Sequence, residues 1–101
     1  DFTYIDDIVE GIYLSLTPLH RSEVINIGSG SPISMLSLLN ELLKYFPEMK
    51  IRREESRTGD VVQTWANIRK AKDLLGYTPK VSFEQGITET VKWAKENETF
   101  L

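Results

Sequence analysis

Val24-Ile25-Asn26-Ile27-Gly28-Ser29-Gly30-Ser31-Pro32 is the stretch that decides the fold. Its β-branched residues predict a buried strand over 24–27, because such side chains pack well on a pleated surface. The glycines and the proline end that strand, and Ser34 follows as a favourable N-cap. The apolar stripe of the next helix predicts the main helix of the core and consists of Met35, Leu36, Leu38, Leu39, Leu42, Leu43 and Phe46. A strand, a tight turn and a helix indicate an α/β fold.

A strand and a helix are predicted before this stretch. The opening run Phe2 to Ile5 has β character. Asp7 to Leu16 has its apolar residues at helical spacing, with Asp7 and Glu10 placed as a capping box. Thr17-Pro18 ends this helix, because the residue before a proline is pushed out of the α region.

A strand and two helices are predicted after it. Lys50-Ile51-Arg52-Arg53 is a short edge strand whose charges discourage aggregation. Asn67 caps a helix that Gly76 ends in the left-handed conformation. Ser82 and Gln85 form a capping box for the last helix. The apolar faces of these helices consist of Ile68, Ala71, Leu74 and Leu75, and of Phe83, Ile87, Val91 and Ala94.

The predicted order is therefore α/β, with three short strands and four helices. Because three short strands rarely form a stable sheet alone, we expect the strands that pair with them to lie outside these 101 residues. The missing initiator Met and the opening on a β-type run also lead us to expect a fragment. Neither a linker nor a repeat divides the chain, so residues 1–101 are predicted to be a single domain.

The composition excludes several classes of function. With 12 Lys and Arg against 15 Asp and Glu, the net charge of −3 offers no basic field for nucleic acid. The absence of cysteine excludes disulfides and a thiolate site and fits a reducing cytoplasm. His20, the only histidine, is expected in a solvated turn. No apolar stretch is long enough to span a membrane, and the first residues lack signal-peptide features, so we expect neither a membrane nor a secretory protein.

Two motifs carry possible binding chemistry. The turn from Gly28 to Gly30 could present backbone N–H groups to a phosphate, although Ile33 stands where a dinucleotide fingerprint has its third glycine. A plain strand-to-helix turn is the favoured interpretation. In Arg57-Thr58-Gly59-Asp60, the guanidinium can fork onto diphosphate oxygens, and the carboxylate can accept from ribose hydroxyls. From spacing alone, a solvated ion pair is the commoner outcome.

The N-terminal segment gives weaker candidates. Tyr4 lacks the neighbouring Lys or His that an acid/base phenol needs. Asp6 and Asp7 are interpreted as helix-start acids that the helix dipole favours. Phe2 could stack on a base or fill the core. Both tryptophans are expected to be packing residues, and no catalytic or metal-binding residue is predicted.

Five motifs occur together in one order: Asp-Phe-Thr-Tyr-Ile-Asp-Asp, Asn-Ile-Gly-Ser-Gly, Arg-x-Gly-Asp, Lys-Ala-Lys-x-Leu-Leu-Gly-Tyr-x-Pro and Glu-x-Gly-Ile-x-x-Thr-Val-x-Trp. This ordered set, which covers nearly the whole chain, resembles the NAD-dependent UDP-sugar 4-epimerases and their dehydratase relatives, which are extended short-chain dehydrogenases/reductases. The resemblance implies the C-terminal substrate-binding part of such an enzyme, without the main Rossmann sheet.

The resemblance also implies roles for particular residues. Arg57 would contact the nucleotide diphosphate, Asp60 the ribose, and Phe2, more weakly, the substrate. Gly28 and Gly30 would form a turn beside the nucleotide pocket rather than a cofactor fingerprint. The sequence departs from the family at Thr64, where an aromatic residue is usual, and begins one residue after an arginine that would be a second diphosphate contact.

The family's glycine-rich NAD loop and its Tyr-x-x-x-Lys pair have no counterpart in these residues. We therefore expect NAD in a longer parent, no cofactor on this chain, and no turnover by the chain alone. The resemblance implies a cytoplasmic UDP-glucose or UDP-glucuronate 4-epimerase with a homodimeric parent. Unpaired apolar surface leads us to expect self-association of the fragment. A nucleotide-sugar dehydratase or reductase, a non-catalytic binding module and a functionless remnant stay as alternatives.

Overall fold

The computed structural model describes residues 1–19 and 21–100, which form four α-helices and a short 3-10 helix. These elements are α1 (Ile5–Leu14), α2 (Met35–Tyr45), α3 (Arg69–Leu75), α4 (Phe83–Glu96) and η1 (Glu98–Phe100). His20, predicted in a solvated turn, lies outside the described residues. None of the helices in the described part is long and apolar enough to cross a membrane.

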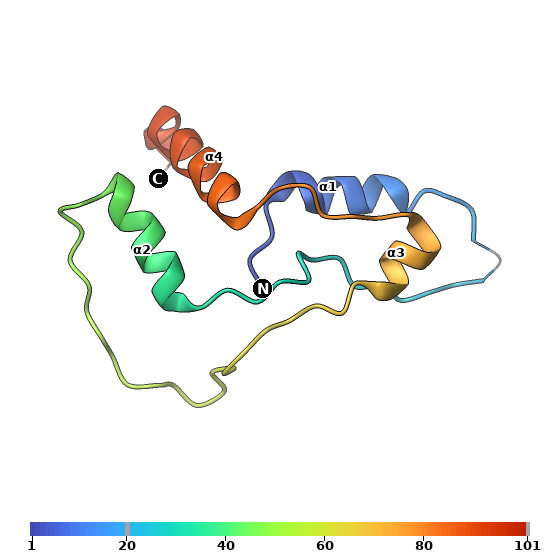
Figure 1. The fold of residues 1–101 in the computed structure, drawn as a ribbon, viewed down its shortest axis with the longest axis horizontal. Coiled ribbons are helices and arrows are strands. Elements are labelled where there is room, and N and C mark those ends of the chain that lie inside the picture. Colours follow the sequence, from blue (N-terminus) through green and yellow to red (C-terminus); the bar gives the residue numbers. More distant parts are fainter. Residues whose placement is uncertain (20, 101) are drawn as a thin grey trace.

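The helices form two pairs, with α1 packed on α3 and α2 packed on α4 (Figure 1). Residues 46–68, which join α2 to α3, contain no helix and run in a wide arc away from both pairs (Figure 1). We call this segment the arm. The radius of gyration is 16.5 Å, whereas a compact chain of this length has about 13 Å. The structure is therefore less compact than usual for its length.

The helix predictions are confirmed, together with most of their end signals. Ser34 Oγ accepts from the Ser37 N–H at 3.1 Å, and Ser82 Oγ accepts from the Gln85 N–H at 3.2 Å. Gly76 ends α3 with φ of +65°. Asn67, predicted to cap α3, lies one position before the N-cap, which is Ile68 and has no side-chain capping bond. Asn67 Oδ1 still accepts from the Arg69 N–H at 3.1 Å.

The strand predictions are not met by the described residues. Of the predicted segments, 2–4, 24–27 and 50–53 lie in irregular backbone, and Ile5 already belongs to α1. A strand exists only where a neighbouring segment completes its hydrogen-bond ladder, and none of the described segments pairs in that way with these three. The α/β prediction is therefore confirmed for its helices alone.

The predicted capping box at Asp7 is wrong. The N-cap of α1 is Tyr4, without a side-chain capping bond, so Asp7 lies inside the first turn. Its carboxylate, 3% exposed, accepts from the backbone N–H groups of Lys80 at 2.9 Å and Val81 at 3.1 Å. Asp7 therefore joins the start of α1 to the segment that leads into α4.

The core lies around α3, not around α2. Its buried cluster is Ile68, Ala71, Leu75 and Tyr77, with Leu14, Ile25, Ile27 and Ala66 packed against it. The prediction of α2 as the main core helix is wrong. Met35 and Leu36 are each 63% exposed, and the buried residue of α2 is Glu41. The apolar stripe of α2 is wide, but α4 covers only part of it.

Tyr77 joins the core to the turn from Gly28 to Gly30, which we call the glycine turn. Its side chain is fully buried, and its hydroxyl donates to the Gly28 carbonyl at 2.8 Å. Burial raises the pKa of Tyr77 above its ordinary value, and the nearby Asp7 carboxylate raises it further. The phenol therefore stays protonated and keeps this donor.

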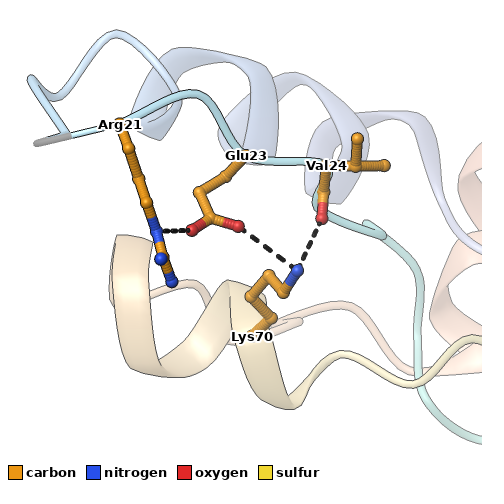
Figure 2. Close-up of polar contacts among 4 residues, drawn as sticks. All are labelled: Arg21, Glu23, Val24 and Lys70. Atoms are coloured by element: carbon orange, nitrogen blue, oxygen red, sulfur yellow. Dashed lines mark hydrogen bonds and ion pairs between the residues drawn. The ribbon is translucent and has the colours of Figure 1, made fainter.

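A charged cluster ties residues 21–24 to α3 (Figure 2). Glu23, with a side chain only 14% exposed, pairs with Arg21 Nε at 2.7 Å and with Lys70 Nζ at 3.3 Å. Lys70 Nζ also donates to the Val24 carbonyl at 3.1 Å. The hydrogen bond from Arg21, followed by that from Lys70, lowers the pKa of Glu23 below its ordinary value of 4.5.

Replacing Tyr77 by Phe should lower the free energy of unfolding by about 1–3 kcal/mol, because the Gly28 carbonyl then loses its buried donor. Urea unfolding of the two proteins measures this loss. Tyr13→Phe is the matched control, since Tyr13 is 68% exposed, and it should leave stability unchanged. Equal stabilities for Tyr77→Phe and the wild type would contradict the assignment.

The Glu23 cluster should make stability depend on pH. Because the folded pKa is lowered, the cluster stabilises fully above pH 4.5 and loses this effect as the pH falls through the folded pKa. The difference in unfolding free energy between wild type and Glu23→Gln should therefore be largest at neutral pH and shrink in acid. Urea unfolding across this range measures it, and a difference that is constant with pH would contradict it.

Candidate functional site

The carboxylate of Asp1 is the polar centre of the chain. Its Oδ1 accepts from the Ser29 N–H at 3.0 Å, the Ser29 hydroxyl at 2.6 Å and the Thr3 hydroxyl at 3.1 Å. Its Oδ2 accepts from the N–H groups of Gly30 and Ala66, both at 3.1 Å. One side chain thus joins the N-terminal segment, the glycine turn and the C-terminal end of the arm around Trp65 and Ala66, which we call the base of the arm.

This arrangement decides between the two interpretations of the glycine turn. The N–H groups of Ser29 and Gly30, which a phosphate would need, donate to the Asp1 carboxylate instead. A second anion at the same donors would meet that negative charge at close range. The turn interpretation is therefore favoured over a phosphate cradle at these N–H groups.

The glycines of the turn are required by close contacts and by backbone geometry. A Cβ on Gly28 would lie 2.7 Å from the Cβ of Ala66, closer than packed carbons approach. Gly30 has φ of +68°, which favours glycine. Trp65 Nε1 donates to the Gly30 carbonyl at 2.9 Å, although its side chain is otherwise 65% exposed. The base of the arm is therefore held directly against the turn.

Arg57 and Asp60 are brought together by a tight turn on the arm. The Arg57 N–H donates to Asp60 Oδ2 at 2.7 Å, and the Asp60 N–H donates to the Arg57 carbonyl at 3.0 Å. Gly59 allows the turn with φ of +95°. The Arg57 side chain is 83% exposed, and its nearest acid is Glu54 at 3.8 Å. The guanidinium therefore faces solvent on a turn that Asp60 closes.

Phe2 lies in a different place. Its ring packs on Phe83 with centroids 5.8 Å apart and an interplanar angle of 48°, and 37% of the residue is exposed. It borders an apolar cleft of about 640 Å³ whose lining includes Tyr4, Leu38, Phe83, Ile87 and Trp93. The lining of this cleft includes no residue of the Arg57–Asp60 turn.

The cleft offers binding surface rather than acid/base chemistry. Burial raises the pKa of Tyr4, and the Asp6 and Glu89 carboxylates raise it further, which is opposite to the shift a phenolate base needs. Within residues 1–19 and 21–100, no group of His, Cys, Asp and Glu is placed to hold a metal ion. Trp93, predicted to be a packing residue, is 52% exposed at the cleft.

Asp1 and Asp7 are the polar residues that the sequence analysis missed. Asp7 was interpreted as a helix-start acid, and Asp1 received no role. Their backbone N–H donors lie 28, 29 and 65 residues away from Asp1, and 73 and 74 residues away from Asp7. No local pattern could identify such partners, since capping and turn signals span only a few residues.

Comparison with a solved structure identifies the class of fold. The chain aligns with MoeE5 in complex with UDP-glucuronic acid and NAD at a TM-score of 0.82 and 28% identity. The alignment covers 95% of this chain and 33% of MoeE5. The four helices, the glycine turn and the arm are thus part of an extended short-chain dehydrogenase/reductase fold, as the motif order predicts.

Residues 1–90 match the family model described as GDP-mannose 4,6 dehydratase, and the chain belongs to this family. It is 47% identical to a UDP-glucuronate 4-epimerase of Thermodesulfobacterium geofontis, over 96% of this chain and 30% of the relative. It is 38% identical to UDP-glucuronate 4-epimerase 5 of Arabidopsis thaliana, over 92% of this chain and 25% of the relative. The chain therefore spans between a quarter and a third of these relatives.

Gly28→Ala should lower the free energy of unfolding by about 1–3 kcal/mol, because the new Cβ overlaps that of Ala66. Ala66→Gly removes the opposing carbon, so the double variant should be more stable than Gly28→Ala alone. Urea unfolding of the wild type, both single variants and the double variant measures this coupling. Strictly additive losses would contradict the contact.

Proposed function

We propose that this chain is the nucleotide-sugar-binding part of an NAD-dependent UDP-sugar 4-epimerase of the UDP-glucuronate or UDP-glucose type. Relatives from a bacterium and a plant that carry the name UDP-glucuronate 4-epimerase support the proposal. So does the likeness to MoeE5, which has been solved with UDP-glucuronic acid and with UDP-glucose. The family description, GDP-mannose 4,6 dehydratase, favours a nucleotide-sugar dehydratase as the second candidate.

The Arg57–Asp60 turn is the observation that carries the proposal. The Arg57 guanidinium is 83% exposed, so little protein contact would have to break before it paired with a diphosphate. Its planar donors match two phosphate oxygens at once. Asp60 uses Oδ2 to close the turn, which leaves Oδ1 to accept from a ribose hydroxyl. The exposed cation and the free carboxylate oxygen thus support the proposal that Arg57 binds the diphosphate and Asp60 the ribose.

Phe2 is proposed as a weaker substrate contact. One side of its ring packs on Phe83, and the exposed part borders the apolar cleft. An aromatic face can stack on a flat base or cover the apolar face of a sugar. The lining of this cleft includes no residue of the arm, so a ligand that touches both Phe2 and the Arg57–Asp60 turn would have to extend from the cleft to the arm.

The residues of this chain do not fit a cofactor role. The glycine turn already directs its N–H groups at Asp1, and the sequence has no Tyr-x-x-x-Lys pair. We therefore propose that NAD, which carries the redox step in such enzymes, is held by other parts of a longer protein. Residues 1–101 are proposed to be a single domain that binds the UDP-sugar and has no turnover alone.

Arg57→Ala should weaken the binding of UDP-glucuronate about tenfold or more, because a hydrogen-bonded charge contributes about 1.5–3 kcal/mol. Arg57→Lys should recover only part of the loss, since an ammonium cannot fork onto two oxygens. Titration calorimetry measures each affinity. Arg52→Ala is the matched control, because Arg52 is another exposed arginine of the arm, paired with Glu54.

Equal affinities for Arg57→Ala and Arg52→Ala would contradict the role of Arg57. Tighter binding of a GDP-sugar than of UDP-glucuronate would favour the dehydratase candidate. If the wild-type protein binds neither nucleotide sugar, the proposed function is wrong, although the fold assignment still holds.

A further inference from the structure

The arm has little support of its own where it carries Arg57 and Asp60. Val61 is 73% exposed and Val62 is fully exposed, so neither packs on the body of the chain. The ion pairs of this region, Arg52 with Glu54 and Arg57 with Glu54, are internal to the arm. The position of the Arg57–Asp60 turn therefore depends on how the ends of the arm are held.

The C-terminal end of the arm, only a few residues beyond the turn, is held by the glycine turn and Asp1. Trp65 donates to the Gly30 carbonyl, and the Ala66 N–H donates to Asp1 Oδ2. Gly28 permits this approach, because any Cβ there would collide with Ala66. The N-terminal end is farther from Arg57 and is held by Phe46, whose ring lies 5.4 Å from Lys95 Nζ.

We propose that Asp1 is a positioning residue for nucleotide binding, because its carboxylate fixes the arm and the glycine turn relative to Phe2. The inference rests on the proposed function of the arm. Phe2 follows Asp1 directly in the chain, so the same carboxylate also sets the backbone from which the Phe2 ring projects. One side chain thereby sets the positions of all the proposed substrate contacts, and it is not itself one of them.

The hydrogen bonds around position 1 require an aspartate. Both carboxylate oxygens accept, and their partners are three backbone N–H groups and two hydroxyls. Asn would turn one acceptor into an NH₂ donor facing N–H donors, so at least one of those bonds must break. Glu adds a methylene group, which displaces the oxygens from their partners in a close-packed setting.

The test compares Asp1→Asn with Asp7→Asn in the intact protein. The two aspartates are matched, because Asp7 also accepts from two backbone N–H groups and also joins distant segments. Amide hydrogen exchange reads the local effect, and titration with UDP-glucuronate reads the functional one. Ser29→Ala, which removes one hydroxyl donor to Asp1, is a milder variant in case Asp1→Asn does not fold.

For Asp1→Asn we expect faster exchange at Ser29, Gly30 and Ala66, and affinity at least about tenfold weaker, because displaced binding groups lose their alignment. Asp7→Asn should instead speed exchange at Lys80 and Val81 and change affinity by no more than about twofold. Ser29→Ala should change exchange and affinity in the same direction as Asp1→Asn, by a smaller factor.

Equal losses of affinity in the two Asp variants would overturn the inference, because general destabilisation would then explain both. Unchanged affinity in Asp1→Asn or in Ser29→Ala would overturn it as well. If the wild-type protein binds no UDP-glucuronate, the proposed function fails instead, and the exchange at Ser29, Gly30 and Ala66 still decides whether Asp1 fixes the arm.

Discussion

Backbone N–H groups that leave water must find an acceptor, and this constraint governs the described part of the chain. No β-ladder supplies acceptors there, so side chains and carbonyls do so. Asp1 accepts from Ser29, Gly30 and Ala66, and Asp7 accepts from Lys80 and Val81. The two aspartates thus provide the long-range connections that strand pairing provides in a complete sheet.

The apolar core holds the glycine turn in addition to these hydrogen bonds. Tyr77 is fully buried in the small cluster around α3, and its hydroxyl reaches the Gly28 carbonyl. The glycine turn is therefore held from one side by the core and from the other by Asp1. The arm, by contrast, meets the body only near its ends, so the position of the Arg57–Asp60 turn depends on the contacts made there, such as those of Trp65 and Ala66.

The sequence predicts what depends on neighbouring residues. Ser34, Ser82 and Gly76 mark helix ends because capping involves residues three or four positions apart. The strands at 24–27 and 50–53 could not be judged in this way, because a strand depends on a partner that composition does not reveal. For the same reason the sequence does not reveal the hydrogen bonds of Asp1 and Asp7, whose backbone partners are distant along the chain. Arg57 and Asp60 were singled out by a family motif. Their three-residue spacing fits the turn that they form, and their binding roles stay a prediction.

The central claim is that one UDP-sugar molecule contacts both the Arg57–Asp60 turn and Phe2. The most direct measurement is an NMR titration of the ¹⁵N-labelled protein with UDP-glucuronate, which reports each backbone amide separately. The account predicts that the amides of Arg57, Asp60 and Phe2 shift together with one dissociation constant, while those around Glu23 do not move. Shifts confined to the Glu23 cluster or to the lining around Trp93, with Arg57 and Asp60 unchanged, would contradict it.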